Sequence, residues 1–123
     1  MKSDVVYLRH MLEAIAQIRE YTQDINATDF RHTRLLQDGV IRQLGIIGET
    51  ARHISLETQE ARSEIPWADV IGARNVLIHD YVDVDVEEVW KTVVDDLPLL
   101  REQVARLLHA LADAGDLSRG EAA

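Results

Sequence analysis

The chain has 123 residues, of which 22 are Asp or Glu and 13 are Lys or Arg, so its formal net charge is −9. Hydrophobic residues make up 46% of it, and cysteine is absent. The length fits one domain and the apolar fraction excludes wholesale disorder. The lack of cysteine excludes a disulfide scaffold, a Cys-ligated zinc site and a thiol nucleophile. The negative charge argues against a protein that coats nucleic acid by bulk electrostatics.

Nothing in the sequence indicates a membrane protein or a secreted one. The N-terminal stretch MKSDVVYLRH lacks the apolar region of a secretory signal. No apolar run approaches the ~20 residues that a membrane-spanning helix needs. We therefore expect a cytoplasmic protein without a membrane partner, with which the absence of cysteine is compatible.

The first half of the chain predicts two long helices, because its apolar residues recur at intervals of three and four. The first covers residues 3–25, with Ser3 or Asp4 as the candidate N-cap. After a polar break, NATDF, the second covers residues 30–58, and Asp29 can cap its start.

Two glycines, Gly45 and Gly48, lie inside the second predicted helix. Each costs roughly 1 kcal/mol relative to alanine in a helix interior. Such a pair favours close approach of another backbone, either within the bundle or at a subunit interface.

The second half predicts a short helix and a long one. Pro66 suits the first turn of a helix over residues 67–78. The acidic stretch DYVDVDVEE is interpreted as a loop followed by the start of a helix. Residues 86–111 carry an apolar seam with alternating spacings of four and three, and Pro98 predicts a kink or break near Asp96 and Leu97.

Together these segments predict an all-α fold, an antiparallel bundle of four to five helices. Gly115 is the expected end of the last helix. We therefore assign residues 1–114 to a single helical domain and residues 115–123 to a flexible C-terminal tail.

No metal site can be recognised. The five histidines include no pair spaced three or four apart, as two ligands on one helix face would be. Asp83, Asp85 and Glu87 imitate the opening of a calcium loop, but Glu88 stands where the loop needs glycine and Val94 where it needs glutamate. We expect neither a metal ion nor a cofactor.

One stretch is chemically dense. RNVLIHDY holds Arg74, Asn75, His79, Asp80 and Tyr81 at the end of the third predicted helix. Asn75 and His79 share one helix face and could form a hydrogen bond. A purely structural interpretation is a polar helix end, in which the arginine pairs with Asp80 and the tyrosine packs on the bundle.

The spacing of Arg, four residues, His, one residue and Tyr resembles the signature of HEPN domains, specifically the HepT-like toxins of bacterial and archaeal HEPN/MNT toxin–antitoxin pairs. The resemblance also covers three longer segments. GVIRQLGIIGETARHIS resembles the family's second helix, with its Gly-Glu pair at Gly48 and Glu49. IPWADVIGARNVLIHDY resembles the segment that contains the motif, and VWKTVVDDLPLLREQV resembles the helix that follows it.

The resemblance implies a metal-independent endoribonuclease that acts as a homodimer, with the motif of each subunit lining a cleft at the interface. His79 would transfer protons, since an imidazole titrates near neutral pH. Arg74 would hold the non-bridging phosphate oxygens through its planar guanidinium. Asn75 would orient His79 or contact RNA, or serve as an ordinary polar helix position. Asp80 would pair with Arg74 or steer the imidazole, or be merely solvated.

The resemblance also implies a regulatory partner. In this family a cognate MNT-type nucleotidyltransferase antitoxin transfers AMP to the motif tyrosine, here Tyr81, which opposes RNA entry because added phosphates repel RNA. The structural alternative is a phenol packed at the bundle edge. Glu49 would hold Arg74 in place, or it would pair with Arg42 or Arg52 on its own helix.

Two further groups of residues have a functional and a structural interpretation. Trp67 and Trp90 are core anchors or platforms on which bases stack. The second predicted helix bears arginines that form a basic strip near the cleft or a solvated face: Arg31, Arg34, Arg42 and Arg52.

Two functions from different classes follow. The first is the toxin of a type VII HEPN/MNT toxin–antitoxin system, an RNA endonuclease neutralised by its antitoxin. The second is a non-catalytic helical interaction or nucleotide-binding module that partners a nucleotidyltransferase, since the apolar seam of residues 86–111 would suit a partner helix. The complete set of Arg74, His79 and Tyr81 favours the ribonuclease, because a decayed site should have lost at least one of the three.

Overall fold

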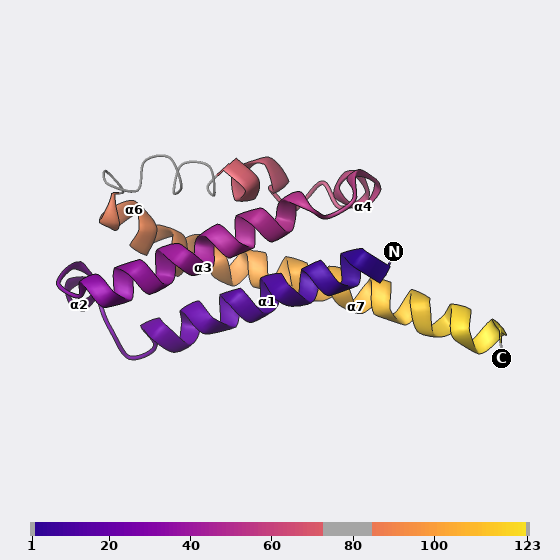
Figure 1. Ribbon diagram of the computed structural model, residues 1–123, viewed down its shortest axis with the longest axis horizontal. Coiled ribbons are helices and arrows are strands. Elements are labelled where there is room, and N and C mark those ends of the chain that lie inside the picture. The colour runs from indigo at the N-terminus through magenta and orange to yellow at the C-terminus, as the bar shows by residue number, and fades with distance from the viewer. Residues whose placement is uncertain (1, 73–84, 123) are drawn as a thin grey trace.

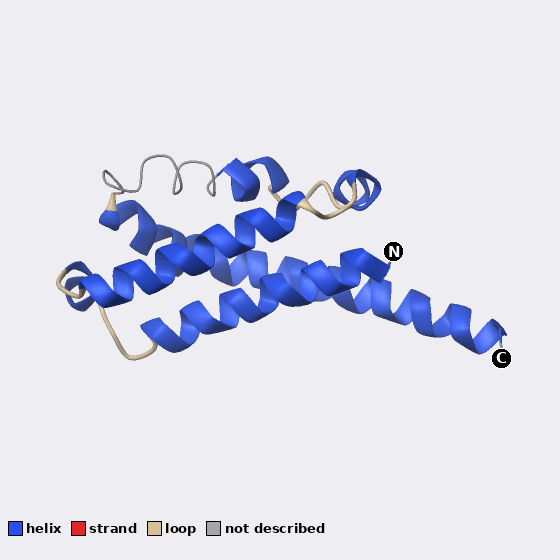
Figure 2. Cartoon of the chain, viewed as in Figure 1, coloured by secondary structure: helices blue, strands red, loops and turns tan. Residues whose placement is uncertain are grey.

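The computed structural model describes residues 2–72 and 85–122, with side chains for residues 4–72 and 85–114. Helices account for nearly all of this part of the chain, and no strand occurs in it (Figure 2). The all-α prediction is therefore confirmed. In chain order the elements are α1 (Lys2–Thr22), α2 (Ala27–Arg31), α3 (Arg34–Arg52), α4 (Leu56–Ala61), a helical segment at residues 67–72, α6 (Val86–Lys91), a π-helical turn (Thr92–Asp96) and α7 (Leu97–Ala122).

Three long helices form the body of the bundle. Figure 1 shows α1 running in the opposite direction to both α3 and α7, and α1 packs against each of them. Their facing sides supply most of the core, which Phe30 of α2 and Ile65 complete. Full burial of each large apolar side chain stabilises the fold by roughly 1.5–3 kcal/mol. The buried residues of the three helices include Leu8, Met11, Ile15, Ile18, Val40, Leu44, Ile47, Val104 and Leu107.

The boundary between the first two predicted helices is wrong, because the polar break contains a helix of its own. α1 ends at Thr22, and Asn26 caps the short α2 through a capping box with Asp29. The Asn26 side chain accepts a hydrogen bond from the Asp29 N–H (2.8 Å), and the Asp29 carboxylate accepts one from the Asn26 N–H (3.1 Å). Asp29 therefore does not cap the following helix, α3, which begins at Arg34 after the extended residue Thr33.

Asp4 is not the N-cap of α1. The helix begins at Lys2, and the carboxylate of Asp4 is fully buried inside the bundle. It accepts hydrogen bonds from the N–H (2.9 Å) and hydroxyl (2.7 Å) of Ser55 and from the hydroxyl of Thr58 (2.6 Å). Ser55 is itself the N-cap of α4, so the helix predicted to reach residue 58 ends instead at Arg52.

The two glycines of α3 are not equivalent. A Cβ placed on Gly45 would have no described atom within 4 Å beyond its own helix and chain neighbours, so the close approach expected there is absent from the described residues. Gly48 is buried. The tight contact lies at Gly39, where a Cβ would stand 3.2 Å from the ring of Tyr21.

The last helices agree with the sequence pattern at their start and differ from it at their end. Asp85 caps α6 by accepting hydrogen bonds from the N–H groups of Glu87 (3.0 Å) and Glu88 (3.4 Å), so the acidic stretch does begin a helix. α7 continues past Gly115 to Ala122, so the expected end of this helix was wrong. Figure 1 shows these last turns extending beyond the start of α1.

A π-helical turn replaces the expected kink near Pro98. The Leu97 N–H donates to the Thr92 carbonyl, five residues back instead of four. Pro98 has no N–H to donate, and a wider turn before it accommodates that gap without interrupting the helix.

Both tryptophans lie in the core. Trp67 is 7% exposed, and its indole N–H donates to the Arg62 carbonyl (3.0 Å). Trp90 is half-buried and packs against Phe30 with ring centroids 5.1 Å apart. This packing favours their interpretation as core anchors.

Candidate functional site

Most of the predicted site residues lie outside the described residues: Arg74, Asn75, His79, Asp80 and Tyr81. Glu49 is the predicted site residue that the structure does describe. The structure therefore defines how the chain enters and leaves the dense polar stretch, and the surroundings of Glu49 on α3.

The chain enters this stretch from a helix start that is fixed to the core. Pro66 precedes the helical segment at residues 67–72, and its carbonyl accepts from the Val70 N–H (3.0 Å). Trp67 is buried beside Ile65, and Val70 packs against the core. The predicted helix start after Pro66 is therefore confirmed, and the backbone leading toward Arg74 is held by buried contacts.

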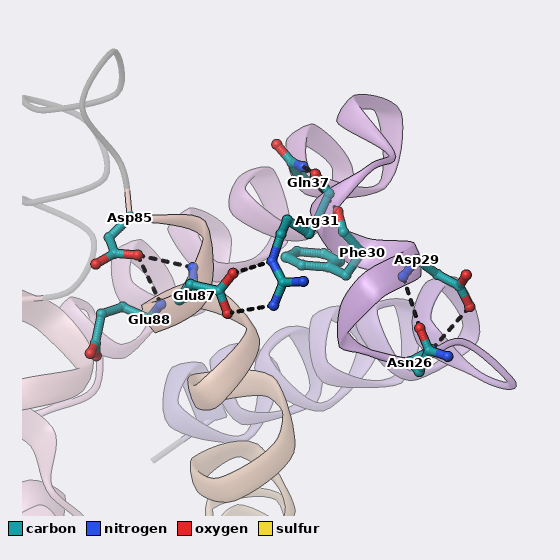
Figure 3. Close-up of polar contacts among 8 residues, drawn as sticks. All are labelled: Asn26, Asp29, Phe30, Arg31, Gln37, Asp85, Glu87 and Glu88. Atoms are coloured by element: carbon teal, nitrogen blue, oxygen red, sulfur yellow. Dashed lines mark hydrogen bonds and ion pairs between the residues drawn. The ribbon is translucent and has the colours of Figure 1, made fainter.

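The chain leaves the stretch at α6, which is tied to α2 (Figure 3). The Arg31 guanidinium donates from Nε to Glu87 Oε1 (2.5 Å) and from Nη2 to Glu87 Oε2 (3.3 Å). These hydrogen bonds lower the pKa of the Glu87 carboxyl and raise the pKa of Arg31. The two side chains are 58% and 47% exposed, so solvent screens the pair, and its value lies in fixing geometry rather than in stability.

Two further contacts hold the same corner together. Phe30 packs against Trp90 of α6. The amide of Gln37, drawn in Figure 3, donates to the backbone carbonyls of Phe30 (2.9 Å) and Arg31 (3.0 Å). The corner thus combines a ring contact and a charged pair, and it fixes the start of α6 at Val86, five residues after Tyr81.

Glu49 lies near the end of α3 in a cluster of polar side chains. Its Oε1 accepts a hydrogen bond from Arg52 Nη2 (2.8 Å) and lies 3.3 Å from His53 Nε2. The hydrogen bond raises the pKa of Arg52. The His53 ring stacks on Tyr7 of α1, with centroids 5.3 Å apart. Of the partners expected for Glu49, Arg52 is therefore present, while a contact with Arg74 falls outside the described residues.

The predicted basic strip is divided among ion pairs. Arg31 belongs to α2 and pairs with Glu87, Arg34 pairs with Asp38 (3.6 Å), and Arg52 pairs with Glu49. Arg42 is exposed on α3. Because three of these four cations face carboxylates, the described part of α3 resembles a solvated face more than a phosphate-binding strip.

The described residues hold neither a recognisable metal site nor a membrane-spanning helix. They contain no group of three or more His, Cys, Asp or Glu side chains placed to hold a metal ion. Among the described helices, none is both long and apolar enough to cross a membrane.

These features define an all-α protein in which a buried helix start precedes residues 73–84 and a capped helix follows them. Residues 11–107 match the protein family described as ribonuclease HepT-like. The chain therefore belongs to the HepT-like ribonuclease family, as the motif and its flanking segments predicted.

Individual relatives agree with this assignment. "Probable ribonuclease HepT" of Thermococcus cleftensis is 41% identical over 101 residues, which is 82% of this chain and 92% of that protein. "Gamma-glutamylcyclotransferase and putative RNase" of Methanocaldococcus jannaschii is 39% identical over 112 residues, and the chain spans 50% of its length. A second protein of that archaeon, named as a "putative RNase", is 36% identical over 104 residues and is spanned to 95%. No solved structure matches the chain.

Proposed function

We propose that this chain is the toxin of a type VII HEPN/MNT toxin–antitoxin system, a metal-independent endoribonuclease of the cytoplasm that cleaves RNA in a cleft between two copies. The observation that carries the proposal is its membership of the HepT-like ribonuclease family over residues 11–107, which include the complete set of Arg74, His79 and Tyr81.

The chemistry needs no metal, because RNA carries its own nucleophile. A base removes the proton of the 2′-hydroxyl, the 2′-oxygen attacks phosphorus, and the 5′-oxygen leaves with a proton from an acid. We assign the proton transfers to His79 and stabilisation of the phosphorane to Arg74, whose planar fork matches its oxygens. Two subunits would supply one imidazole as the base and another as the acid.

Three residues have supporting roles in this proposal. Asn75 and Asp80 position the His79 imidazole or contact RNA. Glu49 positions charge near the cleft: its carboxylate already organises Arg52 and His53 at the end of α3.

The test replaces Arg74 or His79 by alanine and measures cleavage of an RNA oligonucleotide in the presence of EDTA. Matched controls are Arg101→Ala and His109→Ala, since both of these side chains are exposed on α7. We expect the two motif variants to lose cleavage and the two controls to cut like the wild type, leaving 2′,3′-cyclic phosphate ends. If both motif variants cleave RNA as fast as the wild type does, the assigned site is wrong.

We further propose that a nucleotidyltransferase antitoxin neutralises the toxin by transferring AMP to Tyr81. The added phosphates would repel the RNA backbone at the mouth of the cleft. Intact mass after co-expression with the partner encoded beside this gene tests the proposal, and Tyr7→Phe serves as the control. Mass additions of AMP should disappear in Tyr81→Phe and persist in the control; their survival in Tyr81→Phe contradicts the assignment.

The alternative of a non-catalytic interaction module loses its main support in the structure. The apolar seam of the last helices was expected to suit a partner helix, but four of its residues are buried within the bundle: Leu97, Leu100, Val104 and Leu107. This seam is therefore used to hold the chain's own helices together.

A further inference from the structure

A cavity of about 490 Å³ opens between α3, residues 64–70 and the π-helical turn with the start of α7. Its floor is apolar and comes from all three segments. The apolar side chains that line it include Leu44, Ile47, Val70, Leu97, Leu99 and Leu100. Leu99 is 56% exposed, so a bound partner could reach this apolar side chain.

Four carboxylates surround this floor. Glu64 and Asp69 come from the segment of residues 64–70, and Asp95 and Asp96 come from the π-helical turn. All four are exposed, and none forms an ion pair within the described part of the chain. By contrast, Asp38, Glu49 and Glu87 each face an arginine. Within the described residues, no cationic side chain neutralises the negative charge of the cavity.

The π-helical turn contributes to both features of the cavity. It carries Asp95 and Asp96 on the rim, and Leu97 follows it directly on the floor. Single π-helical turns occur often at functional sites, because they change which side chains a helix presents. The turn thus combines two adjacent charges with an apolar floor.

We propose that this groove, which we call the acidic groove, binds an amphipathic helix of a partner protein whose apolar side chains are flanked by lysine or arginine. An apolar groove accepts helix side chains spaced three and four apart. Carboxylates around it select a cationic partner and raise its association rate. The inference concerns protein binding and does not depend on the proposed ribonuclease activity.

Two other occupants fit the groove poorly. RNA is disfavoured, because the four carboxylates around the groove repel phosphate. A second copy bound through the same face would place both sets of carboxylates opposite each other. A cationic helix alone satisfies both the floor and the rim.

The test measures binding by fluorescence anisotropy with a labelled panel of helical peptides. Each peptide presents leucines on one face, in several spacings, with lysines flanking that face. A matched panel replaces every lysine by glutamate. We expect at least one lysine peptide to bind the wild type and no glutamate peptide to do so. Failure of the entire lysine panel, or equal binding by the glutamate panel, would overturn the proposal.

Variants of the exposed groove residues then locate the binding. We expect D95N/D96N and Leu99→Asn each to weaken binding by about tenfold, a loss within the range of a few exposed contacts. Two control variants make matching changes outside the groove. E57Q/E60Q removes two negative charges, as D95N/D96N does, and Leu35→Asn replaces an exposed leucine, as Leu99→Asn does. The peptide affinity of both controls should stay within about twofold of the wild-type value. Equal losses in groove and control variants would mean that overall charge drives the binding, and the acidic groove would be refuted.

Two further outcomes separate the alternative occupants. An RNA oligonucleotide that displaces the bound peptide would assign the groove to nucleic acid. A change of oligomeric state in Leu99→Asn, seen by sedimentation, would assign it to a second copy. Either result would overturn the proposed partner helix.

Discussion

At the scale of single residues, Asp4 shows how one carboxylate can organise two helices. Its side chain lies in α1 but accepts hydrogen bonds from Ser55 and Thr58, at the start of α4. Burial alone would raise the pKa of the Asp4 carboxyl, but the hydrogen bonds from Thr58 and Ser55 outweigh it and lower the pKa below 3.8. Asp4 of α1 thus supports the N-terminus of α4, whose N-cap is Ser55.

Replacing Asp4 by alanine should therefore destabilise the fold. The change leaves one buried N–H and two hydroxyls without their acceptor, which costs about 2–3 kcal/mol of unfolding free energy. Urea denaturation measures the loss, with Glu13→Ala, an exposed position on the same helix, as the control. A loss no larger than that of the control would mean that the network does not stabilise the native state.

The same carboxylate predicts a dependence on pH. Because the folded-state pKa of Asp4 is lowered, its contribution is complete above the ordinary value of 3.8 and is lost as pH falls through the folded-state value. The difference in unfolding free energy between the wild type and Asp4→Asn should stay constant near neutral pH and shrink below about pH 4. Urea titrations of both proteins across this range measure it, and a difference that grows with acid would contradict the assignment.

At the scale of elements, two glycines of α3 offer a direct comparison. Gly45 has open space where a Cβ would stand, so Gly45→Ala should raise the unfolding free energy by roughly 0.5–1 kcal/mol through helix propensity. Gly39→Ala gains the same propensity but forces its methyl to 3.2 Å from the Tyr21 ring, so it should be less stable than Gly45→Ala. Thermal unfolding of both variants tests the order, and the reverse order would contradict the packing at Gly39.

The elements also show what the sequence could predict. The periodic rows of α1, α3 and α7 were recognisable, because the buried face of a long helix repeats every three or four residues. The end of α3 was not, because its position depends on Asp4 and Ser55, which are 51 residues apart. The capping box of Asn26 and Asp29 is local and could have been recognised, but the usual partner at its third position is glutamate or glutamine.

The candidate site likewise contains residues that the sequence predicts and contacts that only the structure reveals. Arg74, His79 and Tyr81 are predicted from a linear pattern, which needs no knowledge of the fold, and they remain a prediction because they lie outside the described residues. The partner of Glu49 was left open between Arg42, Arg52 and Arg74, because each lies at a plausible place in the sequence, and geometry was needed to find Arg52. The link between Arg31 and Glu87 was not predicted, since nothing local joins residues 56 positions apart.

At the scale of the whole molecule, the carboxylates that give the chain its net charge of −9 lie in different environments. Some carboxylates hold arginines in place, while those of the acidic groove face no cation in the described part of the chain. The charge that argues against coating RNA thus becomes compatible with an RNA-cleaving protein that also recruits a cationic partner, because the two tasks require only local surfaces.

The proposed shared cleft predicts that activity depends on assembly. A His79→Ala subunit paired with a wild-type subunit forms a cleft with one imidazole, which cannot serve as both the base and the acid. An excess of His79→Ala should therefore lower RNA cleavage by the wild type on mixing, at concentrations where sedimentation shows dimers. Full activity of the wild type at dilutions where it sediments as a monomer would contradict a cleft shared by two copies.

The central place of α1 has a consequence for biosynthesis. This helix packs against both α3 and α7, so part of its contact surface comes from a segment that the ribosome adds only after residue 96. Until Leu97 and the turns after it emerge, the apolar side of α1 facing α7 stays uncovered. Folding is therefore completed late, so a ribonuclease of this design would acquire its stable form only once synthesis has passed its final helix.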